Sequence, residues 1–146
     1  NVTTLEITKE KDVMSAAKDV IKLMKLDEKK EKFLTSEREA FFKEIIKFGS
    51  KKNLVRIIIT KVGDDICSGS INFRNGYTNL LYNSGYNPQY KSLSIGLINH
   101  IRNIRMCINN GVRVFDFLRG NEDYKYRLGA SDKSIHTIQI SLTDQK

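Results

Sequence analysis

The chain has 146 residues, a typical length for one domain, and its 40% hydrophobic and 29% charged residues describe a globular rather than a disordered protein. No apolar run reaches the length that spans a bilayer, and the first residues show neither a basic leader nor an apolar signal core. We therefore expect a single domain over residues 1–146 in the cytoplasm, although a start without Met also fits a domain cut from a longer protein.

The net charge of +8 suits an anionic partner, either nucleic acid or a phosphate-rich cofactor, but lysines on solvated helix faces would produce the same charge. No helix-turn-helix, zinc-finger or RNA-recognition signature is present, which disfavours nucleic acid. The cysteines and histidines lack metal-ligand spacing, so we expect no metal site. We expect Cys67 and Cys107 to be reduced core residues, and His100 and His136 to be surface or hydrogen-bonded histidines.

The first third of the chain predicts a short strand and two helices. The strand covers residues 5–7, and residues 27–32 form a charged connection or a helix end between the helices. The second helix begins at Thr35 or Ser36, where Ser36 and Glu39 form a capping box. The predicted buried faces are Val13, Ala16, Ala17, Val20, Ile21 and Met24 in the first helix and Phe41, Phe42, Ile45 and Ile46 in the second.

An antiparallel meander follows the helices. Its three strands cover residues 54–62, 66–74 and 77–86. Asn75-Gly76 is the strongest short hairpin signal in the sequence, and Gly85 indicates a bulge or the close approach of another backbone segment. Pro88 then ends the strand and opens a loop.

The last third of the chain predicts a strand–helix–strand crossover. A helix covers residues 95–110, and residues 112–118 form a buried strand parallel to the strand before the helix. A short helix over residues 121–128 and a last strand over residues 135–142 complete the order β-α-α-β-β-β-α-β-α-β, an α/β (α+β) fold. The predicted buried face of the crossover helix is Leu97, Ile101, Ile104 and Ile108.

The loop into the crossover helix is the first candidate binding site. Backbone N–H groups at a helix start lack intrahelical partners and carry partial positive charge, so they form a natural site for a diphosphate. Ser94 and Gly96 are small enough for a phosphate to approach the backbone, and Lys91 adds a positive charge. An ordinary strand-to-helix loop with a serine cap explains the same residues.

Polar residues crowd the turn after the predicted buried strand and form the second candidate site. Asp116 interrupts this apolar strand, where an unpaired carboxylate is costly, so we expect it to have a partner such as Arg119, Lys125 or a ligand. Tyr124 and Tyr126 either contribute to the site or pack in the core with their hydroxyls outward.

The chain resembles the GNAT N-acyltransferase fold, and in particular the bacterial acetyltransferase domain associated with cellulose biosynthesis and related envelope and capsule gene clusters. In that branch a tyrosine and a Gly-Tyr-x-Pro turn precede the crossover helix. The corresponding residues here are Tyr82, Gly85, Tyr86 and Pro88. The branch also has a strand ending in Asp-Phe and then a Gly-x-Glu-x-Tyr-Lys run, which residues 116–117 and 120–125 match. With the element order, the resemblance covers nearly the whole chain and implies a central mixed, mostly antiparallel sheet flanked by helices.

The resemblance implies acetyl-CoA or another acyl-CoA as the donor, with its pyrophosphate in an Arg/Gln-x-x-Gly-x-Gly/Ala loop. The matching residues here are Lys91, Ser92, Leu93, Ser94, Ile95 and Gly96, followed by Leu97. Lys91 replaces the Arg or Gln, and Ser94 replaces the first glycine.

The resemblance also implies direct transfer of the acyl group to an amine. Tyr124, with Tyr126 as the fallback, would protonate the leaving thiolate, and Glu122 or Asp116 would act as the base. The expected substrate-binding residues are Tyr86, Arg119 and Lys125.

The implied acceptor is an amine on a sugar or amino-acid-like molecule in envelope polysaccharide metabolism. The alternative is a non-catalytic structural or acceptor-binding half of a two-domain transferase, since the related Fem-type peptidoglycan aminoacyl transferases carry two such domains. The expected protein partner is therefore a second GNAT-like domain or a second copy of the chain, with no membrane and no nucleic acid.

Overall fold

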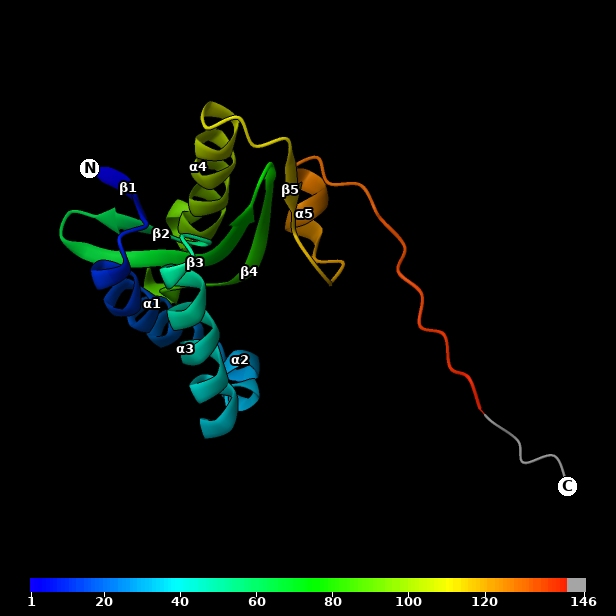
Figure 1. The fold of residues 1–146 in the computed structure, drawn as a ribbon. Helices are drawn as coiled ribbons and strands as arrows, with labels where there is room; N and C mark the ends of the chain where they lie inside the picture. Colours follow the sequence, from blue (N-terminus) through cyan, green and yellow to red (C-terminus); the bar gives the residue numbers. More distant parts are fainter. Residues whose placement is uncertain (142–146) are drawn as a thin grey trace, which may run out of the picture.

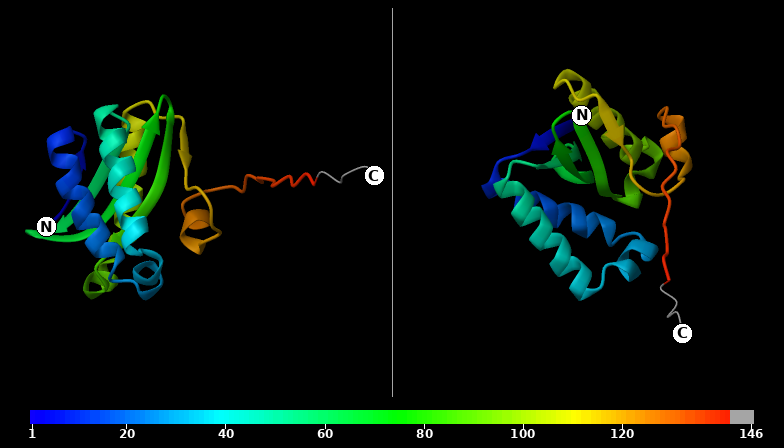
Figure 2. Two further views of the ribbon diagram at one scale, coloured as in Figure 1. Left: turned by 60° about the horizontal axis from the view of Figure 1, so that its bottom comes forward. Right: turned by 45° about the vertical axis from the view of Figure 1, so that its right-hand side comes forward.

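The computed structural model describes residues 1–141, which form a five-stranded sheet with helices on both faces (Figures 1 and 2). The elements are β1 (Val2–Ile7), α1 (Glu10–Met24), α2 (Glu28–Phe33), α3 (Ser36–Lys51), β2 (Val55–Val62), β3 (Asp65–Asn75), β4 (Thr78–Tyr86), the 3-10 helix η1 (Pro88–Leu93), α4 (Ile95–Asn109), β5 (Val114–Asp116) and α5 (Asp123–Arg127). The predicted α/β class, with a mostly antiparallel sheet between helices, is confirmed.

The strands lie in the order β1-β2-β3-β4-β5, with antiparallel neighbours from β1 to β4 and β5 parallel to β4. The β3–β4 hairpin closes at the pair Asn75 and Thr78. Gly76 in its turn has a φ of 56°, which glycine adopts without the steric cost that a side chain would add. The predicted meander and its hairpin are confirmed.

One face of the sheet carries the apolar core. Helices α1 and α3 cover this face (Figure 2). The core residues are Val13, Ala16, Ala17, Val20, Ile21 and Met24 of α1, Leu34, Phe42 and Ile46 from the α3 side, and Val55, Ile57, Ile59 and Ile71 of the sheet. The predicted apolar stripe of α1 is therefore confirmed, and each fully buried aliphatic side chain contributes about 1.5–3 kcal/mol.

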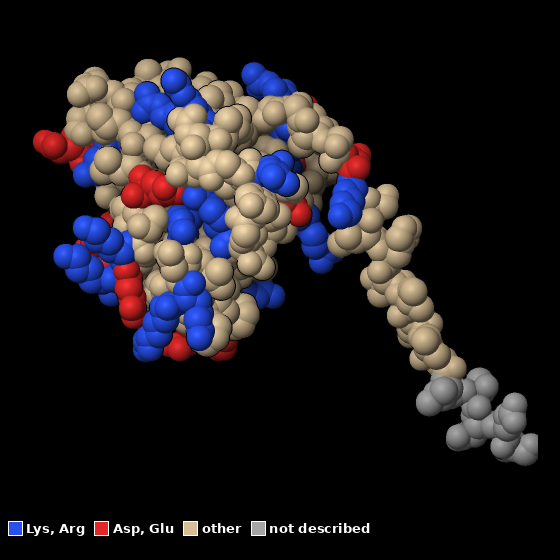
Figure 3. Space-filling view, turned by 45° about the horizontal axis from the view of Figure 1, so that its top comes forward, with Lys and Arg blue, Asp and Glu red and all other residues tan. Residues whose placement is uncertain are grey.

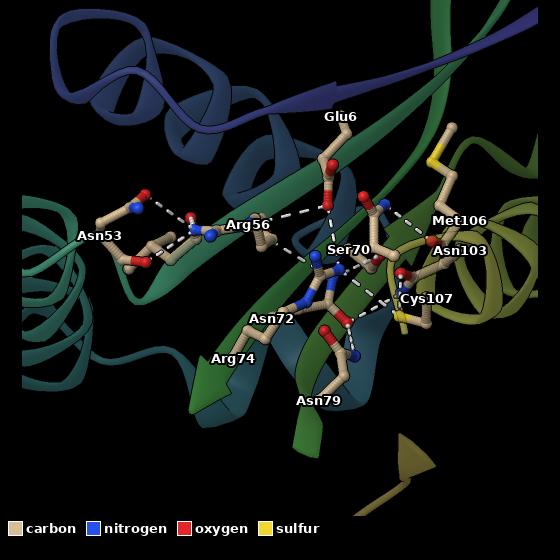
Figure 4. A network of polar contacts seen from close by, with 12 residues as sticks. Glu6, Asn53, Arg56, Ser70, Asn72, Arg74, Asn79, Asn103, Met106 and Cys107 are labelled. Carbon is tan, nitrogen blue, oxygen red and sulfur yellow. Dashed lines mark hydrogen bonds and ion pairs between the residues drawn. The ribbon is translucent and has the colours of Figure 1, made fainter. Parts of the chain in front are cut away.

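The other face of the sheet is polar and is covered by α4. Asn99 Nδ2 donates to Thr60 Oγ1 at 3.0 Å, and Asn103 Nδ2 donates to Asn72 Oδ1 at 2.8 Å. Asn79 Nδ2 donates to the same Asn72 oxygen at 3.0 Å. Figure 4 shows this network continuing across the sheet towards Glu6, Arg56 and Arg74. Hydrogen bonds between buried amides thus hold α4 on the sheet.

This arrangement overturns the predicted buried face of α4. Ile101 is 47% exposed and Ile108 is 67% exposed, while Leu97 and Ile104 are half-buried. The buried residues of α4 are instead Ile95, Asn99, His100, Asn103 and Cys107. The prediction is wrong because the sheet surface beneath α4 offers hydrogen-bonding partners, and only a polar helix face can satisfy them.

A short helix, α2, forms where a charged connection or a helix end was predicted. Asp27 is its N-cap and accepts a hydrogen bond from the Lys30 backbone N–H at 3.0 Å. No residue of α2 is fully buried, but Lys30 is half-buried and points to β4.

Helix α3 begins where it was predicted, at Thr35 or Ser36, but its cap differs from the prediction. Thr35 is the N-cap, and its hydroxyl accepts from the Arg38 backbone N–H at 3.4 Å. The predicted capping box of Ser36 and Glu39 is wrong because the Glu39 carboxylate pairs with Lys25, which directly follows α1, and with Lys43 of α3. Phe41, which was predicted to be buried, is 58% exposed.

The chain after α4 is less regular than predicted. The predicted buried strand over residues 112–118 is reduced to the three residues of β5, where Val114 is 50% exposed at the edge of the sheet. Residues 135–141 of the predicted last strand have no regular structure and extend away from the body (Figure 1). Leu142, the end of that prediction, lies outside the described residues. Within residues 1–141 no segment pairs with the outer edge of β5, so strand hydrogen bonds are lacking there.

The remaining features agree with the composition. Cys67 and Cys107 are buried free thiols, as predicted. On the face in Figure 3, lysine and arginine side chains lie among acidic and neutral ones, which agrees with charges on solvated helix faces. None of the helices in the described part of the chain has the length and apolar character to cross a membrane.

Candidate functional site

The parallel strands β4 and β5 separate after three residue pairs. They pair from Thr78 with Val114 to Leu80 with Asp116, and β4 then continues to Tyr86 without a β5 partner in the described chain. The β3–β4 register also shifts, so that Tyr82 is an extra residue without an opposite partner on β3. Backbone groups of β4 are therefore available to a ligand that lies along its free edge.

The β4–α4 loop (residues 87–94) leads from this free edge to the start of α4. Ser94 lies in the left-handed region, with φ 50° and ψ 38°, and its hydroxyl does not cap the helix. The first turn of α4 contains no acidic side chain. The N–H groups of Ile95, Gly96 and Leu97 therefore have no side-chain cap and are available to an anion such as a diphosphate.

The other predicted donor-site residues lie around this helix start. Lys91, Ser92 and Leu93 are on η1 and are exposed. Gly96 faces the ring of Tyr86, and a Cβ at position 96 would lie 3.4 Å from Tyr86 Cδ1. The Tyr90 hydroxyl donates to Asp65 Oδ2 at 2.7 Å, which anchors η1 to the β2–β3 turn. Tyr86 and the start of α4 are thus brought together.

The β5–α5 turn (residues 117–122) uses the carboxylate of Asp116 as its support. Asp116 Oδ1 accepts from the Leu118 backbone N–H at 2.7 Å, and Leu118 has a φ of 57°. Asp116 is exposed and forms no ion pair with Arg119 or Lys125, so the expectation of a buried carboxylate with one of these partners is wrong, while a ligand as its partner stays a prediction. The reason is that β5 is an uncovered edge strand, where water solvates the carboxylate.

Lys125 stabilises the same turn by hydrogen bonds to its backbone. Its side chain is buried, and Nζ donates to the carbonyl oxygens of Arg119 and Gly120 at 2.9 and 3.2 Å. It also forms an ion pair with Glu122 Oε2 at 2.8 Å. An ammonium has three N–H donors, so these partners occupy all of them. Lys125 therefore fixes the turn, and Arg119 contributes its backbone carbonyl while its side chain is exposed.

Glu122 sits at the rim of this turn. The hydrogen bond from Lys125 is the main cause that lowers the pKa of the Glu122 carboxyl. Gly120 has a φ of 111°, and a Cβ there would lie 2.4 Å from Glu122 Oε2. Glycine at position 120 thus makes room for the Glu122 carboxylate.

Tyr124 is held between two aromatic rings. Its ring stacks on His100 with centroids 5.0 Å apart and 11° between the planes, and it meets Phe117 edge-on at 6.2 Å. Burial, with a smaller effect of the Glu122 charge, raises the pKa of Tyr124 to about 12. The phenol therefore stays protonated at neutral pH, as a proton donor must.

His100 was not predicted to belong to the site. It is 6% exposed, and its Nδ1 has no hydrogen-bond partner among the described residues, so the expectation of a surface or hydrogen-bonded histidine is wrong. Burial, and then the ammonium groups of Lys30 and Lys125, lower the pKa of His100 to about 4. His100 is therefore neutral at physiological pH.

Lys30 is the second residue that sequence reasoning missed. Its Nζ donates to the carbonyl oxygen of Ser84, on the part of β4 that has no β5 partner. Its charge acts on both Glu122 and His100. Lys30 lies in a run of similar lysines, so the sequence gives no signal that distinguishes it.

The predicted residues thus form two groups, one at the start of α4 and one around Tyr124. Within residues 1–141, one surface hollow lies between α1 and α3 and another beside β1 and α1, and neither contains a predicted site residue. No cluster of histidine, cysteine and acidic side chains that could hold a metal ion is present in this part of the chain.

Residues 3–126 match the family model described as "Acetyltransferase (GNAT) domain". A search of curated protein sequences found no match. The match covers the strands, the β4–α4 loop, the β5–α5 turn and nearly all of α5, and so includes both groups of candidate residues.

Solved structures share the fold at low sequence identity. An aminoglycoside acetyltransferase from an uncultured soil metagenomic sample, in complex with sisomicin, has a TM-score of 0.67 and 12% identity over 97% of each chain. A predicted acetyltransferase from Clostridium acetobutylicum with acetyl-CoA has a TM-score of 0.68 and 10% identity over 95% of this chain and 96% of that one. A transcriptional regulator from Bacillus halodurans has a TM-score of 0.64 and 14% identity over 97% and 100%. These likenesses show the fold alone.

Proposed function

The chain belongs to the GNAT acetyltransferase family, and on that basis we propose that it transfers an acyl group from an acyl-CoA to an amine. The observation that supports this most is the separation of β4 from β5 next to the uncapped start of α4. A pantetheine arm can lie along the free edge of β4 while its diphosphate meets the helix N–H groups.

The donor site consists mainly of backbone groups. We assign the diphosphate to the N–H groups of Ile95, Gly96 and Leu97, with Ser94 and the exposed Lys91 beside them. Because these contacts come from the backbone, the replacement of a glycine by Ser94 leaves the donors in place. Ser94 adopts the left-handed conformation that the glycine would adopt.

The reaction we propose is direct transfer. A neutral amine attacks the thioester carbon, a C–N bond forms, and the C–S bond breaks. The thiolate takes the proton of the Tyr124 hydroxyl, and the proton lost by the amine passes to Glu122 or to water. The irregular, unpaired part of β4 near Tyr82 offers backbone N–H groups to the carbonyl oxygen as negative charge develops on it.

We prefer Glu122 to Asp116 as the base. The charge of Glu122 acts on the pKa of both Tyr124 and Lys30, so Glu122 lies near both groups. The Asp116 carboxylate instead accepts a hydrogen bond from the Leu118 backbone N–H in the β5–α5 turn. The lowered pKa of Glu122 makes it a weak base. Part of the amine's proton is therefore lost through water to bulk solvent rather than to Glu122.

The acceptor is an amine of a sugar or an amino-acid-like molecule, and an envelope polysaccharide is the biological setting that the sequence resemblance favours. Aminoglycosides are the competing acceptor class, because a structural neighbour is an aminoglycoside acetyltransferase.

Acetyl-CoA binding tests the proposal. We expect millimolar acetyl-CoA to raise the melting temperature of the protein and Gly96→Glu to abolish the rise, since a carboxylate at the helix start repels the diphosphate. Ile101→Glu adds the same charge further along α4, at a position that is 47% exposed, and should keep the rise. No rise in the wild-type protein would refute the proposal, and binding without turnover of any amine would favour the non-catalytic module.

A further inference from the structure

Lys30 on α2 reaches the free part of β4. Its Nζ bonds to the Ser84 carbonyl oxygen, four residues beyond the last β4 residue that pairs with β5. Lys29 and Lys32, its neighbours on α2, are exposed to solvent. The chain thus brings one ammonium group to the place where the acyl group and the acceptor amine would meet.

The charge of Lys30 is not neutralised by an ion pair. Of the carboxylates in residues 1–141, Asp27 and Glu122 act on it electrostatically, but neither lies within ion-pairing distance. Burial is the main effect and lowers the pKa of Lys30. An anion beside the half-buried Lys30 would offset the cost of this burial. One carbonyl oxygen also leaves N–H donors of the ammonium without an acceptor.

The other charged groups nearby are already committed. Lys125 uses its donors for Arg119, Gly120 and Glu122, and Glu122 is paired with Lys125. His100 is neutral, because its pKa is about 4. The Asp27 carboxylate, which also acts on Lys30, caps α2 by accepting from the Lys30 backbone N–H at 3.0 Å. Lys30 is therefore the cation of this group whose ammonium forms no ion pair among residues 1–141.

We propose that the acceptor carries a carboxylate near its reactive amine and that Lys30 binds this carboxylate. The proposal rests on the proposed acyl transfer. A single ammonium suits a singly charged carboxylate. The same charge disfavours polycationic acceptors, because a second ammonium beside Lys30 would meet like-charge repulsion.

The donor diphosphate is another source of negative charge, and the arrangement of the elements disfavours it. Lys30 comes from α2, which lies on the side of α1 and α3, whereas α4 and its N–H groups lie on the opposite face of the sheet (Figure 2). Lys30 therefore approaches β4 from the side that the donor loop leaves open to the acceptor.

Matched acceptors test this inference. Glucosamine and muramic acid share an amino sugar, but only muramic acid has a carboxylate, and sisomicin provides a polycation. We expect the wild-type protein to prefer muramic acid. Lys30→Met should lower kcat/KM for muramic acid by about tenfold or more, because a charged partner of the carboxylate is lost. The rate with glucosamine should change little, and Lys30→Arg should restore part of the loss.

Lys29→Met is the matched control, since it removes an exposed lysine from the same helix. Binding of each amine in the presence of CoA, measured by calorimetry, gives a readout that does not require turnover. Equal use or binding of the three amines, or no binding of muramic acid at all, would overturn the inference. So would a tenfold loss of CoA affinity in Lys30→Met with acceptor preference unchanged. Failure of the wild-type protein to bind CoA would instead count against the proposed acyl transfer itself.

Discussion

The imidazole of His100 stacks on the phenol ring of Tyr124, with ring centroids 5.0 Å apart and planes only 11° from parallel. The two residues come from α4 and α5, so this contact joins the crossover helix to the last helix of the described chain. It also places the buried, neutral His100 in contact with Tyr124, which we assign as the general acid.

The burial of His100 predicts a pH dependence of stability. The unfolded chain protonates His100 below pH 6.5, but the folded chain resists protonation until about pH 4, so stability falls as the pH drops through this interval. The effect of His100 amounts to at most about 3 kcal/mol. His100→Phe keeps an aromatic ring and removes the titration, so the free energy of unfolding in urea should depend less on pH between 4 and 6.5.

His136→Phe is the control for this experiment, because His136 is exposed in the segment after α5. Its pH profile should match that of the wild-type protein. An unchanged slope in His100→Phe would mean that the folded protein protonates His100 as easily as the unfolded chain does.

Tyr124 gives the second prediction. Removing its hydroxyl in Tyr124→Phe should lower kcat by about a hundredfold, a typical loss for a general acid, while acetyl-CoA affinity and the His100 stack remain. Tyr126→Phe is the matched variant: Tyr126 is exposed, and its hydroxyl is bonded to Asp132 at 2.7 Å. Steady-state kinetics that show the larger loss in Tyr126→Phe would transfer the acid role to Tyr126.

The sequence was sufficient to predict the elements whose structure depends on local patterns. The apolar stripe of α1 and the Asn75-Gly76 hairpin are local patterns, and both are found in the structure. The family motifs selected two segments, the start of α4 and the β5–α5 turn, whose local geometry includes the left-handed Ser94 and Leu118, and their role as a site stays a prediction.

The orientation of α4 could not be read from its own residues. Its isoleucines repeat at helical spacing, yet Asn99 and Asn103 face the sheet because Thr60 and Asn72 lie beneath them. Periodicity reports an apolar face but not the polarity of the surface that it meets. The sequence could not identify Lys30 either, because its partner is the backbone carbonyl of a residue 54 positions away in the chain.

Ser94 gives the third prediction. A residue with a side chain in the left-handed region is strained by about 1 kcal/mol relative to glycine. Ser94→Gly should therefore raise the free energy of unfolding slightly, by up to about 1 kcal/mol, and acetyl-CoA should bind at least as tightly. Ser92→Gly, on the exposed η1 segment, has no such strain to relieve and should not stabilise the protein. A weaker CoA affinity in Ser94→Gly would show that the serine hydroxyl itself contacts the donor.

Gly85 gives the last prediction, because it lets α1 pack against β4 beside Ser84. A Cβ at position 85 would lie 2.4 Å from the Met24 backbone N and 2.6 Å from the Leu23 carbonyl carbon, and backbone atoms cannot move aside cheaply. Gly85→Ala should lower the free energy of unfolding by about 3 kcal/mol or prevent folding. Gly96→Ala, whose Cβ would make an ordinary 3.4 Å contact with Tyr86, should change stability much less in the same urea titrations. Equal stability of the two variants would mean that the end of α1 shifts away from β4. Lys30, the third residue of α2, would then lose its fixed position over Ser84.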